Sequence, residues 1–62
     1  MAVMVGEVLE IYMDTTTSMA KVRVGETQIR VPLRLLHNVK VGDQVVIEGG
    51  EAVGVVDDRP FG

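Results

Sequence analysis

The sequence predicts an all-β protein, a small barrel of five strands with one short helical turn. Three observations support this prediction. Hydrophobic residues alternate with a period of two over most of the chain, as in half-buried strands. Glycine-containing turn signals separate the runs at short spacing. The chain has 62 residues, enough for a single domain.

The first run, residues 2–13, is rich in valine, leucine, isoleucine and methionine. It is long for one strand, and Gly6 is predicted to mark a bulge or bend that lets the strand curve. The polar cluster of residues 14–18 is predicted to be a surface loop.

The second and third runs are predicted to form a hairpin. Small and aliphatic residues alternate with charged or polar ones over 20–24 and again over 27–31. Gly25-Glu26 between them is typical of a tight turn. Pro32 ends the third strand because it has no amide hydrogen for a ladder.

A helical turn is predicted over residues 33–36, placing leucines over an open end of the barrel. Residues 41–43 form the next turn, in which Asp43 can accept a hydrogen bond from its own loop backbone. Residues 44–48 then form the fourth strand, with Val45 and Ile47 directed into the core.

Gly49-Gly50 is predicted as the turn into the fifth strand, residues 51–56. Five short strands with closely spaced turns indicate a small OB-like or SH3-like barrel, in which closure removes exposed edges. Residues 1–57 would be this single domain, and residues 58–62 a flexible C-terminal tail.

Composition argues against several functions. The chain has no cysteine and a single histidine, His37, so disulfides, thiolate metal sites and a histidine zinc site are not expected. No nucleophile, base and oxyanion group come together in the pattern, and Asp57-Asp58 is interpreted as a solvated pair in the tail. We therefore expect no enzyme activity, no cofactor and no bound metal.

Charge and aromatic content bear on partners and location. A formal charge of −3 and only two aromatic residues disfavour nucleic-acid binding. Apolar runs are too short to span a membrane, and no basic segment of a secretory signal precedes the first run. A cytoplasmic protein is the expectation.

The sequence resembles the HypC/HupF family, small OB-like accessory chaperones for the maturation of nickel–iron hydrogenases. The resemblance covers Val3 to about Val56 and consists of an ordered series of short motifs rather than one diagnostic motif. The matching segments are Gly6-Glu7-Val8-Leu9-Glu10-Ile11, Ala20-Lys21-Val22-Arg23-Val24-Gly25, Val31-Pro32-Leu33-Arg34-Leu35-Leu36, Asn38-Val39-Lys40-Val41-Gly42-Asp43-Gln44-Val45 and Gly50-Glu51-Ala52-Val53.

Departures from the family pattern mark candidate site residues. Family members place a cysteine after the initiator methionine, where it is thought to help hold an iron fragment and to contact the hydrogenase large subunit. Ala2 stands there, and a methyl group cannot ligate iron. Glu48 replaces a histidine and Glu51 a phenylalanine of the family pattern.

The resemblance implies a non-catalytic accessory protein that binds a metalloenzyme large subunit or a maturation protein. The apolar N-terminus contains two adaptable methionines, so its residues Met1, Ala2, Val3 and Met4 are predicted to bind the partner as a docking strand. Glu48 and Glu51, at the altered positions, are the second choice. The same N-terminal residues could instead form only the first barrel strand. Two other functions stay open: a self-associating structural barrel, and an OB-type nucleic-acid-binding module, which the charge disfavours.

Overall fold

A computed structural model describes residues 3–34, 36 and 38–56 of the chain. The described part is all-β, as predicted, and forms five antiparallel strands in one sheet. Met1, Ala2, Leu35, His37 and the predicted tail lie outside the described residues. The strands are β1 (Val3–Asp14), β2 (Thr17–Val24), β3 (Thr27–Pro32), β4 (Gln44–Glu48) and β5 (Glu51–Val56).

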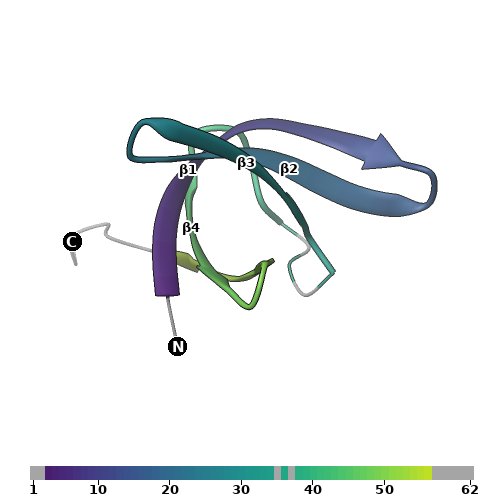
Figure 1. The fold of residues 1–62 in the computed structure, drawn as a ribbon. Helices are drawn as coiled ribbons and strands as arrows, with labels where there is room; N and C mark the ends of the chain where they lie inside the picture. The colour runs from purple at the N-terminus through teal and green to yellow at the C-terminus, as the bar shows by residue number, and fades with distance from the viewer. Residues whose placement is uncertain (1–2, 35, 37, 57–62) are drawn as a thin grey trace, which may run out of the picture.

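Strand β1 connects the two halves of the sheet, whose order is β3-β2-β1-β4-β5. Its first residues pair with β4, and its later residues pair with β2 in a long hairpin that projects to the right in Figure 1. The predicted irregularity lies at Leu9 rather than at Gly6, because Val8 pairs with Val22 while Glu10 pairs with Lys21. Leu9 is thus the extra residue of a bulge, where a strand bends and increases its twist.

The sheet curls on itself without closing. Strands β3 and β5 approach each other, but within the described residues no ladder of hydrogen bonds joins them. The predicted barrel is therefore correct in having five curled strands. The predicted closure is not observed, because β3 and β5 are not joined within the described residues. Pro32 ends β3 without a donor, and β5 contains an extra residue, Val53, opposite β4. A partly open five-stranded barrel is a form that OB-folds take.

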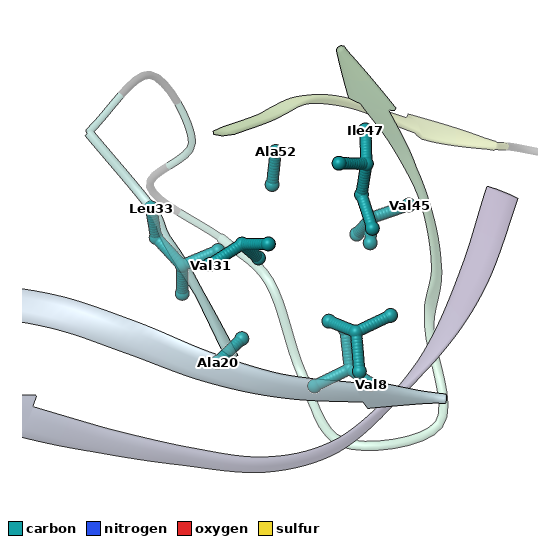
Figure 2. Close-up of a cluster of buried hydrophobic side chains, with 8 residues drawn as sticks. Val8, Ala20, Val31, Leu33, Val45, Ile47 and Ala52 are labelled. Atoms are coloured by element: carbon teal, nitrogen blue, oxygen red, sulfur yellow. The ribbon is translucent and has the colours of Figure 1, made fainter. Parts of the chain in front are cut away.

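The core fills the inside of this curl. Figure 2 shows core side chains from all five strands directed toward one another. Val45 and Ile47 are buried, which confirms their predicted direction. Burial of aliphatic surface at about 25 cal/mol per Å² supplies most of the stability of such a chain. The core residues are Val8, Ala20, Val22, Val31, Leu33, Val45, Ile47 and Ala52.

The connection between β3 and β4 differs from its prediction. Among the described residues of 33–36 there is no helix, and Arg34 lies in a turn. Four residues are too few to repay the cost of helix nucleation. The packing role of this segment is nevertheless present, because Leu33 is buried and Leu36 packs against the core.

The turn before β4 is confirmed with its hydrogen bonds. The Lys40 amide donates to Asp43 Oδ2 at 3.0 Å, which is the side-chain bond that was expected of Asp43. Two further backbone bonds, Val8 N to Asp43 O at 2.8 Å and Gly42 N to Val8 O at 2.9 Å, attach this turn to β1. The turn therefore fixes where β4 begins beside β1.

The two short hairpin turns are also confirmed, at Gly25-Glu26 and at Gly49-Gly50. The predicted loop of residues 14–18 is shorter than expected, because Asp14 already pairs with Thr17 across Thr15 and Thr16. Thr15 has a φ of 59°, the left-handed region that β-branched residues rarely adopt. Tight pairing of the hairpin holds Thr15 in this conformation.

Replacing Thr15 by asparagine is expected to raise the free energy of unfolding by about 1 kcal/mol. The left-handed conformation costs an ordinary L-residue roughly 1–2 kcal/mol, and asparagine tolerates it better. The matched control is Thr16→Asn, because Thr16 does not share the positive φ. Urea unfolding of both variants measures the difference, and equal stabilities would contradict the strain assigned to Thr15.

Candidate functional site

The predicted docking strand begins β1. Val3 and Met4 are its first two residues, and Met1 and Ala2 lie outside the described part of the chain. Val3 is opposite Glu48 of β4, and Met4 is opposite Ile47. Because successive residues of a strand point to opposite faces, Val3 and Met4 belong to different faces of the sheet. Met4 lies on the face of the core residue Ile47, and Val3 lies on the outer face.

The two acidic candidates lie beside Val3. Glu48 pairs with Val3 on one side and with Glu51 on the other, so the three residues form one row across β1, β4 and β5. Gly49 and Gly50, with φ of 62° and 81°, make the two-residue turn that sets Glu48 and Glu51 opposite each other. The register therefore brings together three residues that were predicted from separate stretches of sequence.

The surroundings of these carboxylates are open. Glu48 is exposed, and Glu51 is half-buried, with its Oε1 atom 3.9 Å from Arg34 Nε. An ion pair of this length between exposed side chains contributes little to stability. Both carboxylates are accordingly available to a partner.

Val5 and Val46 form the row beside this one, and the partner-binding residues predicted from the sequence did not include them. Val5 pairs with Val46, which pairs with Gly54 of β5, so the next row of the outer face is apolar. Val3 is 56% exposed and Val5 48% exposed, while Val46 is half-buried. We call the set Val3, Val5, Val46, Glu48 and Glu51 the valine face. The sequence signal for Val46 was its position between the core residues Val45 and Ile47, which places it on the opposite face of the strand.

A model of the HupF/HypC family matches residues 3–60, nearly the whole chain. The chain belongs to the HupF/HypC family. Membership suggests an accessory protein of hydrogenase maturation, since members are chaperones rather than enzymes. No curated protein and no solved structure matches this chain.

The valine face of this HupF/HypC protein offers contact area and two carboxylates rather than a reactive group. Within residues 3–34, 36 and 38–56, no three histidine, cysteine, aspartate or glutamate residues are grouped so that they could hold a metal ion. No helix in this part of the chain is long and apolar enough to cross a membrane. A contiguous exposed apolar patch with a polar rim is one of the features of surfaces that bind another protein.

Proposed function

We propose that this HupF/HypC protein is a non-catalytic accessory protein that binds a hydrogenase large subunit or a maturation protein through its valine face. The observation that carries the proposal is the cluster of two exposed valines on β1 and one half-buried valine on β4, bordered by Glu48 and Glu51. These residues lie on the side of the sheet away from the core. They can therefore be covered by a partner without a change of fold.

Two features support contact with a protein. The valines give apolar area whose burial favours association, and the carboxylates at one end of the face can pair with cations of the partner and fix its orientation. The role proposed here is binding and not iron ligation, because Ala2 carries no donor atom where family members have a cysteine.

Replacing Val5 by glutamate is expected to weaken partner binding at least about tenfold, because a carboxylate would be buried against apolar surface. The matched control is Met13→Glu, which introduces the same charge into the same strand at a residue that is 62% exposed. Eight residues separate the two positions, roughly 26 Å along the strand. Titration calorimetry with the purified large subunit and maturation protein of the same host measures both affinities.

Equal affinities of the two variants would contradict the valine face as the docking surface. Absence of binding to either protein by the unmodified chain would contradict the proposed function itself. A second copy of the chain is the alternative partner, because strands β3 and β5 are sheet edges in the described part of the structure. Sedimentation velocity would assign the face to self-association if a dimer of the unmodified chain became a monomer in Val5→Glu.

A further inference from the structure

A hollow of about 360 Å³ lies on the other half of the sheet, and Glu10, Tyr12, Lys21 and Arg30 line it. Glu10 of β1 pairs with Lys21 of β2, which pairs with Arg30 of β3. The three charged residues therefore form a row across adjacent strands about 4.8 Å apart. We call this site the cationic hollow. Lys21 lies between the core residues Ala20 and Val22, and Arg30 directly precedes the core residue Val31, so this row lies on the outer face.

Among the described residues, neither cation of the hollow forms an ion pair. In the part of the chain that the structure describes, the ion pairs are Arg23 with Glu7 and Arg34 with Glu51, so neither Lys21 nor Arg30 has a carboxylate within 4 Å. Like charges directly opposite each other on a sheet repel. Lys21 and Arg30 thus form a local concentration of positive charge on a chain whose formal net charge is −3. An anion placed over Lys21 and Arg30 would offset the repulsion and gain charge-assisted hydrogen bonds from both side chains.

We propose that the cationic hollow binds a carboxylate side chain in an acidic segment of a partner protein. Arg30 can donate two parallel hydrogen bonds to a carboxylate, Lys21 can donate from the adjacent strand, and the Tyr12 hydroxyl can donate a further bond. Glu10, at the end of the row, accepts from a backbone amide or cation of the same segment. A polypeptide supplies donors as well as carboxylates, which matches a hollow of mixed charge.

The composition of the hollow disfavours a nucleic acid as its occupant. Glu10 would face a phosphate backbone, and among the described residues Tyr12 is the one aromatic residue that lines the hollow. Strands that bind single-stranded nucleic acid usually present several aromatic platforms in a positively charged groove. The hollow lies on β1, β2 and β3, whereas the valine face lies on β1, β4 and β5. This inference therefore does not depend on the proposed function.

Nuclear magnetic resonance titration of the ¹⁵N-labelled chain tests the proposal with a capped peptide of four glutamates as probe. We expect chemical-shift changes at the amides of Tyr12, Lys21 and Arg30, and none with a capped peptide of four glutamines. The double variant Lys21→Gln/Arg30→Gln should lose at least about tenfold in affinity, since the charge-assisted bonds of both side chains are removed. The control Arg34→Gln/Lys40→Gln changes the net charge equally outside the hollow, and its affinity should stay within about twofold.

Each other outcome overturns the proposal. Equal losses in the two double variants would assign binding to net charge rather than to the hollow. A response to inorganic phosphate as strong as the response to the glutamate peptide would indicate a site for small anions. Tighter binding of single-stranded oligothymidylate at the same amides would assign the hollow to nucleic acid. Absence of any shift with the glutamate peptide would remove the site, and the amide spectrum itself shows whether each variant is folded.

Discussion

Replacing Gly6 by alanine is expected to lower the free energy of unfolding by about 3 kcal/mol. A Cβ atom at this position would lie 2.8 Å from the Arg23 carbonyl oxygen and 2.8 Å from Val24 Cγ2, and closer still to Val22 Cγ1. Overpacking of a core costs about 1–3 kcal/mol and occasionally more. A chain of this size has roughly 3–9 kcal/mol in total, so the substitution would remove about a third or more of the stability.

The cost is large because the neighbours of Gly6 cannot move easily. One of the close atoms is a backbone oxygen of β2, and β2 is held between β1 and β3 by ladders on both sides. Gly6 therefore allows β1 to approach β2 closely, whereas the bulge lies at Leu9. Removal of the glycine would force the two strands apart at the point where β1 passes from β4 to β2.

The matched control for this prediction is Gly54→Ala. Gly54 also lies within a strand, and a Cβ atom there would have no neighbour within 4 Å among the residues that the structure describes. Its effect on stability should be below about 1 kcal/mol, since strand interiors generally accept alanine in place of glycine. Far-ultraviolet circular dichroism during urea unfolding measures both variants. A Gly6→Ala chain as stable as Gly54→Ala would refute the close approach.

The strands were predictable because each has its own local signal. Alternation identified 20–24 and 27–31, and the glycine pair at 49–50 located the turn between β4 and β5. Closure of the sheet was not predictable in this way. Whether β3 and β5 join depends on how far β1 twists at its bulge and on the extra residue Val53 in β5. Neither quantity follows from a pattern of alternating residues.

The bulge also explains why the cationic hollow was missed. Counting by twos from the buried residue Val8 places Glu10 and Tyr12 on the core face. The extra residue, Leu9, reverses this order, because a shift of one residue moves every later side chain to the other face. Glu10 and Tyr12 therefore join Lys21 on the outer face. The sequence contains the residues of the hollow, and the irregular pairing decides that they meet.

Only part of the valine face was predicted, because the sequence alone did not show which strand residues share a face. Val3 was chosen as part of an apolar N-terminus, and Glu48 and Glu51 as departures from the family pattern; the register of β1, β4 and β5 places the three in one row. Met4 was grouped with Val3 as its neighbour in the chain, whereas adjacent strand residues face opposite sides. The pairing of Met4 with Ile47 places it beside the core. Membership of the binding surface depends on the face of the strand and not on proximity in sequence.

Replacing Ile47 by alanine is expected to lower the free energy of unfolding by about 3 kcal/mol, within the 2–5 kcal/mol typical of such core truncations. Ile47 is 1% exposed and is among the largest fully buried side chains. It pairs with Met4 and with Ala52, whose small side chain has little capacity to fill the cavity. Collapse around the site would therefore be limited, and the full cost of the cavity would remain.

The control is Val46→Ala, one residue earlier in β4 and on the opposite face. Val46 is half-buried on the valine face, so its truncation should cost no more than about 1 kcal/mol of stability. Partner binding should show the reverse order, because Val46 is part of the proposed contact and Ile47 is not. Urea unfolding and titration calorimetry of the two variants measure both quantities. If Val46→Ala destabilised the chain as much as Ile47→Ala, the valine face would belong to the core, and the separation of folding and binding between the two faces of β4 would be wrong.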